Sequence, residues 1–582
     1  MTAGRVHSVA HTGAAGLWRR CAGGVVVTLV LTLMSATPFG AAVRAHDGVD
    51  TVVEAARAGD VEAVRALLKR GGDVNQAQGD GMTALHYAAQ SGQVELVQML
   101  LSAGANVRAT TRLGGYTPLH LASLGGHASA VAALIASGAS AESRTTTGAS
   151  ALMLAARSGS VETVNRLIEN GAPVNAADTA NGQTALMVAA GLDRAEVVRA
   201  LVARGAQTGL ASTVVNLAKL TQEVEADPLN GQVRRNAPAT ASESTQVAGL
   251  TRPYTYNELI SAQGGLTALH FAARQGAAAS VAALVESGAL IDQPSPGDRA
   301  TPLLVAIING HFDVARYLLD KGANPNQVSE AGVSPLYAAL NVQWAPIAAY
   351  PQPRAHLQQQ MTYLDMMRLL LERGADPNVR VNRKVWYSSY NFDQSSVDEV
   401  GATPFWRAAY AADLEAMTLL VKAGADPSIS TMKPMSRRFG GGGAPDADKS
   451  GLPPVPVGGP NVTPLQAASG VGYGFGFAAN SHHFAKTGLL AAVKYLVEVT
   501  GADVNARDAD GNTAVHHAAA RGDNAMIQYL IDKGAVVTYV NRSGQTTVDM
   551  ANGPVQRTQP FPETIALLEK LGAVNNHKCV SC

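Results

Sequence analysis

The sequence predicts an all-α solenoid of about twelve helix-turn-helix repeats with hairpin fingers and several loop insertions. A tetrapeptide close to Thr-Pro/Ala-Leu-His, such as Thr83–His86, recurs ten times along the chain. Twelve apolar stretches close with Gly-Ala or a near variant, such as Gly104-Ala105. The step from His86 to His120 is 34 residues, and the next two equivalent steps are 33 and 34 residues. A fixed period of this size is typical of an array in which each unit contacts only its neighbours.

Each position of the repeat has a local structural reason. A Thr or Ser opens the first helix as an N-cap, and its side-chain oxygen accepts a hydrogen bond from an unpaired N–H of the first turn. Pro then fits the first helical position, where its missing N–H costs nothing. Ala-Ala pairs keep this helix thin so that repeats can approach, and Leu pairs such as Leu100-Leu101 give the second helix an apolar stripe. The closing Gly suits the left-handed backbone that ends a helix.

This pattern resembles the ankyrin repeat over roughly residues 48–577, with interruptions. The resemblance implies helix pairs joined by β-hairpin fingers, which the Ala-Asp-x-Asn stretches at 375–378 and 502–505 would form. It also implies that the recurrent histidines bond to backbone and to the capping hydroxyls. Those histidines are His86, His120, His270 and His516. The small share of aromatic (5%) and charged (15%) residues agrees with close-packed helix pairs better than with one large core.

The period and its interruptions divide the chain into seven segments. We expect a signal peptide at 1–45, repeats 1–5 at 46–208, an inserted linker at 209–262, repeats 6–9 with insertions at 263–427, a flexible Gly/Pro-rich loop at 428–461, repeats 10–12 at 462–577 and a C-x-x-C tail at 578–582. Since each repeat is stabilised by its neighbours, the long linker is expected to weaken the coupling between the first five repeats and the others.

The first 45 residues have the order of a secretory signal. Arginines precede the apolar run 21–36, and small residues follow, with Val43-Arg44-Ala45 as a cleavage site. We therefore expect an exported protein, periplasmic or secreted; the alternative is an inner-membrane anchor formed by 21–36, which is short for a span. The segment contains four Arg and no acidic residue, so the mature chain would carry 41 basic and 45 acidic residues. This charge disfavours nucleic acid as a partner.

The insertions indicate where a partner would bind. Those at 208–263, 382–399 and 428–461 lengthen fingers, whereas those at 344–360, 470–488 and 552–562 lengthen the turn between paired helices. Insertions in repeat proteins often decorate the binding face, and aromatic residues anchor interfaces. We therefore predict partner binding at five aromatic residues: Trp386, Tyr387, Tyr390, Phe392 and Trp344. The alternative is that these rings fold the loops down onto the stack.

The sequence gives little support to catalysis. The histidine pairs 482–483 and 516–517 are adjacent on the backbone, and such neighbours rarely converge on one metal. We expect no metal and no cofactor. The remaining chemical motif is Cys579-Val580-Ser581-Cys582, which lacks the following His of a c-type haem attachment site. After export, a disulfide or thiol exchange at these cysteines is the other interpretation.

Two functions of different class follow. The first is a non-enzymatic exported scaffold that binds a protein partner, of unknown identity, through the concave face and fingers of the array. The second is a redox accessory protein that presents Cys579 and Cys582 as a thiol pair or a degenerate haem site. If the signal is cleaved, no stable membrane insertion is expected.

Overall fold

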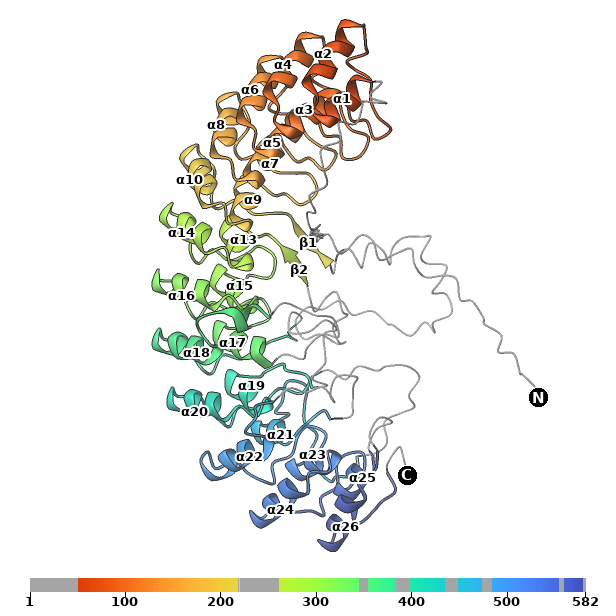
Figure 1. Cartoon of the computed structure of the whole chain (residues 1–582). Helices are drawn as coiled ribbons and strands as arrows, with labels where there is room; N and C mark the ends of the chain where they lie inside the picture. The colour runs from red at the N-terminus through yellow and green to blue at the C-terminus, as the bar shows by residue number, and fades with distance from the viewer. Residues whose placement is uncertain are drawn as a thin grey trace, which may run out of the picture. The chain divides into compact units, whose positions relative to one another are not determined.

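The computed structural model describes residues 51–217, 219, 261–344, 354–383, 385, 397–434, 448–473, 484–553 and 559–578. The chain divides into two compact units, 1–49 and 50–582, and every described residue belongs to the second. Among the described residues of this unit, 24 α-helices form twelve consecutive pairs (Figure 1). The predicted solenoid of about twelve helix-turn-helix repeats is therefore confirmed. Below, repeat n is the nth helix pair together with the segment that precedes it, which is called its finger.

The first five pairs precede the long insertion. They are α1 (Val52–Ala58) with α2 (Val61–Lys69), α3 (Ala84–Ser91) with α4 (Val94–Ser102), α5 (Pro118–Gly125) with α6 (Ala128–Ala136), α7 (Ala151–Ser158) with α8 (Val161–Glu169), and α9 (Ala185–Gly191) with α10 (Ala195–Ala203). Strands β1 (Val214–Asn216) and β2 (Ala262–Gly264) lie at the two ends of the insertion.

Seven pairs follow. They are α13 (Ala268–Gln275) with α14 (Ala278–Glu286), α15 (Pro302–Ile308) with α16 (Phe312–Asp320), α17 (Pro335–Trp344) with α18 (Tyr363–Glu372), α19 (Pro404–Tyr410) with α20 (Leu414–Lys422), α21 (Pro464–Ala468) with α22 (Leu489–Glu498), α23 (Ala514–Ala520) with α24 (Asn524–Asp532), and α25 (Thr547–Ala551) with α26 (Pro562–Lys570). A short 3-10 helix, η1 (Ala355–Gln358), lies between α17 and α18.

The helix ends follow the predicted chemistry. In repeat 3, Thr117 Oγ1 accepts from the N–H of His120, and Pro118 occupies the first helical position. Gly126 then ends α5 with φ 72°, in the left-handed region. After α4, Gly104 has φ 87°. The N–H of the following Ala105 donates to the carbonyl of Leu100 at 3.0 Å, which closes the second helix.

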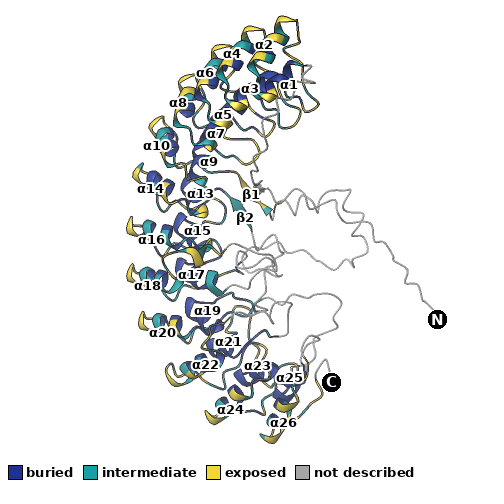
Figure 2. Ribbon diagram, viewed as in Figure 1, coloured by how far each residue is buried: buried dark blue, intermediate teal, exposed yellow. Residues whose placement is uncertain are grey.

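The helices form two layers (Figure 1). First helices pack against first helices of the next repeats, and second helices pack likewise, while the fingers extend on the first-helix side. The small residues Ala88 and Ala89 of α3 are fully buried, as are Leu96 and Leu100 of α4. Exposed residues lie mainly on the free side of the second-helix layer (Figure 2). The core is therefore a continuous seam between the layers, extended by each repeat.

An asparagine in the finger links successive repeats. In repeat 9, Asn378 Nδ2 donates to the carbonyl of Gly424 at 3.0 Å, and its Oδ1 accepts from the N–H of Asp426 at 2.8 Å. The same pair of bonds is made by Asn75, Asn175, Asn326 and Asn505. At these five positions the asparagine thus couples one repeat to the next, and at Asn75, Asn378 and Asn505 it belongs to an Asp-x-Asn element.

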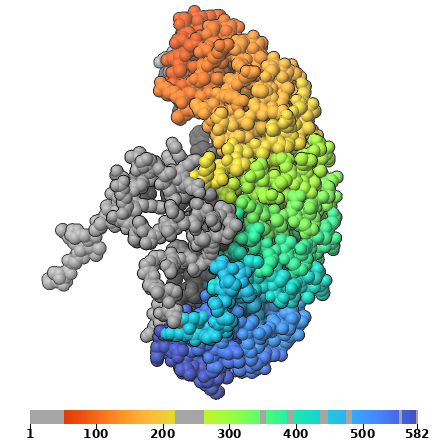
Figure 3. Space-filling view, turned by 180° about the vertical axis from the view of Figure 1, so that it is seen from behind, coloured from red at the N-terminus to blue at the C-terminus, as the bar shows by residue number. Residues whose placement is uncertain are grey.

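Repeats 5 and 6 pack directly on each other despite the long insertion. α9 packs against α13 and α10 against α14, as in the other neighbouring pairs, and the two repeats adjoin in Figure 3. β1 and β2 pair antiparallel, with Val214 opposite Gly264, and close the base of the insertion. Asp193 Oδ1 also accepts from the N–H of Ser280 at 2.7 Å. The expectation of weak coupling at this junction is therefore wrong, because the insertion leaves from a finger without separating the helices.

Candidate binding surface

In repeats 2, 3 and 6, the third residue of the first helix is a histidine that ties one repeat to the next. His86, His120 and His270 are fully buried. In each, Nδ1 accepts from the backbone N–H of the capping Thr at 3.1–3.2 Å. Because Nδ1 accepts, Nε2 carries the hydrogen and donates to a carbonyl of the following finger, 3.0 Å away in His270. Burial lowers the pKa of these imidazoles, for His270 to about 4. The structural role expected for these histidines is confirmed.

In repeats 9 and 10, Trp and Gln at this position also donate a hydrogen bond to the next finger. Trp406 Nε1 donates to the carbonyl of Val462 at 3.0 Å. Gln466 accepts from the N–H of Thr463 and donates to the carbonyls of Ala506 and Asn512. Met153, Met187 and Leu304 hold the same position in repeats 4, 5 and 7 without a side-chain donor. The position therefore does not depend on the acid–base chemistry of an imidazole.

The next residue of each first helix, four after the capping residue, forms a second line, here called the N4 column. Its members are Ala55, Tyr87, Leu121, Leu154, Val188, Phe271, Val305, Ala338, Arg407, Ala467, His517 and Met550. Leu121, Leu154 and Phe271 are 7–9% exposed, so they lie at the edge of the core. The column is apolar, apart from the Tyr87 hydroxyl, as far as repeat 8. Arg407 and His517 then interrupt it, and both are buried.

Trp344 is bound to the stack at repeats 8 and 9. Its Nε1 donates to Asp413 Oδ2 at 2.8 Å, and the Tyr363 hydroxyl donates to the same oxygen at 2.7 Å. The two rings meet edge to face, with centroids 6.1 Å apart. Asp413 Oδ1 also accepts from the N–H of Ala416 and caps α20. Burial and then the charge of Asp413 raise the pKa of the Tyr363 hydroxyl well above its usual range. Trp344 therefore packs on the array, which was the alternative to its predicted role in partner binding.

Two arginines gather beside aromatic rings in repeats 9–11. Arg407 is 4% exposed, and its Nε donates to Asn341 Oδ1 at 2.9 Å. Its Nη1 is buried and has no hydrogen-bond partner among the described residues. Arg521, in the turn after α23, lies over Tyr473 and Phe484, with its guanidinium carbon 5.0 and 5.9 Å from the ring centroids. Burial lowers the pKa of Arg521, because the charged form loses contact with water.

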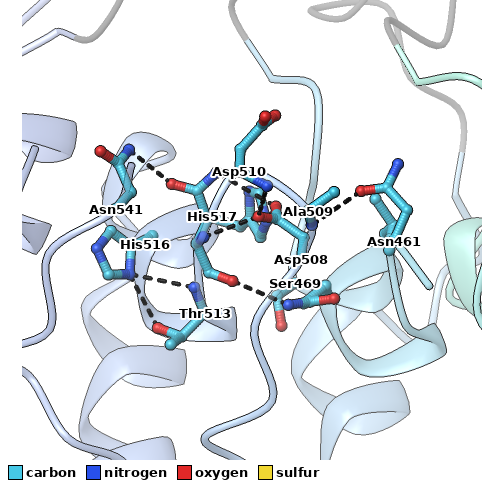
Figure 4. A network of polar contacts seen from close by, with 12 residues as sticks. Asn461, Ser469, Asp508, Ala509, Asp510, Thr513, His516, His517 and Asn541 are labelled. Carbon is cyan, nitrogen blue, oxygen red and sulfur yellow. Dashed lines mark hydrogen bonds and ion pairs between the residues drawn. The ribbon is translucent and has the colours of Figure 1, made fainter. Parts of the chain in front are cut away.

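A buried polar network lies in the fingers of repeats 11 and 12 (Figure 4). Asp508 Oδ2 and His517 Nε2 are 3.2 Å apart, and their side chains are 4% and 8% exposed. Asp508 Oδ1 also accepts from the backbone N–H groups of Asp510 and Asn512 at 3.0 and 2.8 Å. Burial raises the pKa of Asp508, but the hydrogen bonds from His517 and Asn512 outweigh it and hold that pKa below its ordinary value. His517 therefore serves an internal contact in this structure.

Part of the predicted flexible loop packs on these fingers. In segment 448–460, the carbonyl of Pro453 accepts from Arg542 Nη2 at 2.7 Å, and the carboxylate of Asp448 pairs with the same guanidinium. At the other end of the segment, Lys433 Nζ donates to the carbonyl of Val455 at 2.7 Å. Segment 448–460 is therefore held against the array, because backbone carbonyls in this Gly/Pro-rich stretch accept from Arg and Lys side chains.

Most residues of the predicted site lie outside the described residues. These are Trp386, Tyr387, Tyr390 and Phe392 of the repeat 9 finger, together with Cys579, Cys582 and the expected signal 1–45. The base of that finger is described: Val385 and Val397 are buried, and Arg383 pairs with Glu330 at 3.0 Å. The finger therefore begins and ends in fixed positions on the array.

The sequence reasoning missed Arg407, Arg521 and Asp508. A signal for Arg407 was present, since a charged residue stands where earlier repeats have Leu, Val or Phe. Over the described ranges, no group of three or more His, Cys, Asp or Glu side chains is arranged to hold a metal ion. None of the helices in these ranges combines the length and apolarity needed to cross a bilayer.

Comparison with known proteins gives matches to ankyrin repeats. A family described as ankyrin repeats in three copies matches residues 29–111, 52–145, 119–211 and 248–329. A second, described as ankyrin repeats in many copies, matches 481–531. A putative palmitoyltransferase, ZDHHC13 of Danio rerio, is 34% identical over 168 residues. That alignment covers 28% of this chain and 25% of the fish protein, so the chain spans about a quarter of that relative.

Proposed function

Because the chain belongs to the ankyrin repeat family, whose repeats generally bind other proteins, we propose that it is a non-enzymatic scaffold for a protein partner. The partner would lie along the first-helix side and the fingers. The supporting observation is that several large exposed apolar side chains of the described ranges lie on fingers, namely Leu113, Val214, Val215, Leu290 and Val457, although others, such as Leu357 and Val574, lie elsewhere. Exposed apolar surface of this kind favours association. Palmitoyl transfer is stated of the fish relative and is not part of this proposal.

The repeat 9 finger is the part of this surface that we propose to test. Its four aromatic residues stand between two buried anchors, Val385 and Val397, so they can be changed without altering the base. We expect replacement of Trp386, Tyr387, Tyr390 and Phe392 by Ser to reduce partner capture at least tenfold, because aromatic anchors supply most interface energy. Crosslinking capture from the native host, followed by measurement of the Kd with the purified partner, would give the result.

The matched control lies in the same finger. Replacement of Ser388, Ser389 and Asn391 by Ala keeps the aromatic residues and the length of the finger. Capture should then be unchanged. Equal capture by the aromatic variant and the wild type would rule out this finger as the binding element.

Export remains part of the proposal. The order of charged, apolar and small residues in 1–45 supports a cleaved signal and a periplasmic or secreted location. An intact-mass measurement of the protein from its native host should show a chain that lacks this segment. A chain that retains 21–36 and fractionates with the membrane would favour the anchored alternative. The redox alternative depends on Cys579 and Cys582. A Soret absorption band in the purified protein would favour its haem form, whereas a spectrum without that band would leave the two cysteines as a thiol pair or a disulfide.

A further inference from the structure

Among the described residues, the buried guanidinium of Arg407 has no counter-charge. Asn341 satisfies Nε, but Nη1 is buried and has no hydrogen-bond partner among the described residues. In the same ranges, neither Arg407 nor Arg521 takes part in an ion pair. In the sequence, the insertions 345–353 and 474–483 of repeats 8 and 10 contain no Asp or Glu, whereas 386–396 and 435–447 each contain one Asp. Burying an unpaired charge destabilises a fold, so the array retains this arginine at a cost.

The surroundings of Arg407 fit an anionic group. Its guanidinium carbon is 5.8 Å from the centroid of the Tyr410 ring, and Tyr410 is also close enough to Arg521 to influence that guanidinium. Arg521 in turn lies over Tyr473 and Phe484, and Phe484 is 41% exposed. Arg407 of repeat 9 and Arg521 of repeat 11 therefore both lie beside aromatic rings of repeats 9 and 10. With Nε occupied, the remaining Nη1–Nη2 edge has the fork geometry that a carboxylate accepts with both oxygens.

We infer that Arg407 and Arg521 form a site for carboxylate side chains from an acidic segment of the protein partner. The inference rests on the proposed function, because it gives the chemistry of one part of the partner. Arg407 would hold one carboxylate in the desolvated position beside Asn341. Arg521, nearer the solvent, would hold a second carboxylate, while the aromatic rings contact the aliphatic parts of the segment.

Binding of a fluorescein-labelled octaglutamate peptide to the full chain, followed by fluorescence polarisation, tests the inference. We expect saturable binding by the wild type and none of an octaglutamine peptide. Arg407→Gln and Arg521→Gln should each weaken binding roughly 10- to 100-fold, the range for loss of charged hydrogen bonds. Arg274→Gln is the matched control, because Arg274 also lies over a ring, that of Phe271 at 5.1 Å, and its loss changes the net charge equally.

A second variant separates recognition from folding. Asn341→Asp would place a carboxylate against Arg407 with almost no change of shape. If the buried charge of Arg407 is uncompensated, the new carboxylate should stabilise the fold and occupy the arginine. This variant should therefore melt at a higher temperature than the wild type and bind octaglutamate more weakly. A lower melting temperature together with unchanged binding would overturn the inference.

Three other outcomes would also overturn it. They are no saturable octaglutamate binding by the wild type, equal loss of binding in Arg274→Gln, and inorganic phosphate binding as tightly as the peptide, which would indicate a small-anion site. If the finger variant loses its partner while octaglutamate does not bind, the scaffold function stands and only this inference fails.

Discussion

Asp508→Ala is expected to destabilise repeats 10–12 while leaving the N-terminal repeats unchanged. The substitution removes the acceptor for His517 Nε2 and for two backbone N–H groups, all in a buried site. Leaving buried hydrogen-bond donors without their acceptor costs about 1–3 kcal/mol for each donor. Because each repeat is stabilised by its neighbours, the loss should stay local. Hydrogen exchange followed by mass spectrometry should show faster exchange in 489–553 and unchanged exchange in 84–203.

Asp298→Ala is the matched control for this prediction. Asp298 also organises a finger turn, since its Oδ1 accepts from the N–H of Ala300 at 3.1 Å and from Ser295 Oγ at 2.9 Å. It has no buried histidine partner, so its loss should cost only about 1 kcal/mol. Equal changes in exchange for the two variants would mean that Asp508 serves the turn alone and that its pairing with His517 adds nothing.

The repeat itself could be predicted because its rules are local. The N-cap Thr117, the following Pro118 and the closing Gly126 act within a single turn of chain, so their spacing in the sequence is their spacing in space. The same reasoning assigned the histidines correctly, since Thr267 and His270 are only three residues apart. Where a structure depends on neighbours within one helix, the sequence carries nearly all of the information.

Contacts between repeats of unequal spacing could not be predicted in the same way. Arg407 meets Asn341, which is 66 residues earlier, and Arg542 meets Asp448, which is 94 residues earlier. The insertions make these separations irregular, so no period relates the partners. The linker between repeats 5 and 6 was misjudged for a related reason. The length of the linker suggested weak coupling between repeats 5 and 6. The two ends of the linker pair with each other instead, with Val214 opposite Gly264, so the repeats stay in contact.

Acidification is expected to unfold the array through its buried neutral histidines. The pKa of His270 is lowered to about 4 and that of His516 to about 3, chiefly because burial disfavours the charged ring. The unfolded chain takes up a proton near pH 6.5, whereas the folded chain does so only near these lower values. Stability is therefore fully present above about pH 6.5 and is lost as pH falls toward 4. Each of these two histidines should contribute roughly 2 kcal/mol of loss between pH 7 and pH 5.

Neighbouring carboxylates modify this behaviour in the C-terminal repeats. Burial and the charge of Asp508 raise the pKa of Asp510, so the folded chain takes up that proton first and gains stability as pH falls. The pKa of Asp508 is held low, so its contribution is lost only in stronger acid. His270 of α13 has no such network among the described residues and should give the simpler response.

His270→Gln tests the role of the ring, because Gln466 already makes both bonds at the equivalent position of repeat 10. The variant should keep the bonds to the capping Thr and to the next finger and lose the titration. We expect its stability at pH 7.5 to fall by no more than about 1 kcal/mol. Between pH 7 and pH 5, hydrogen exchange in repeats 6 and 7 should change much less than in the wild type. An unchanged pH dependence would show that the acid sensitivity of these repeats arises from groups other than His270.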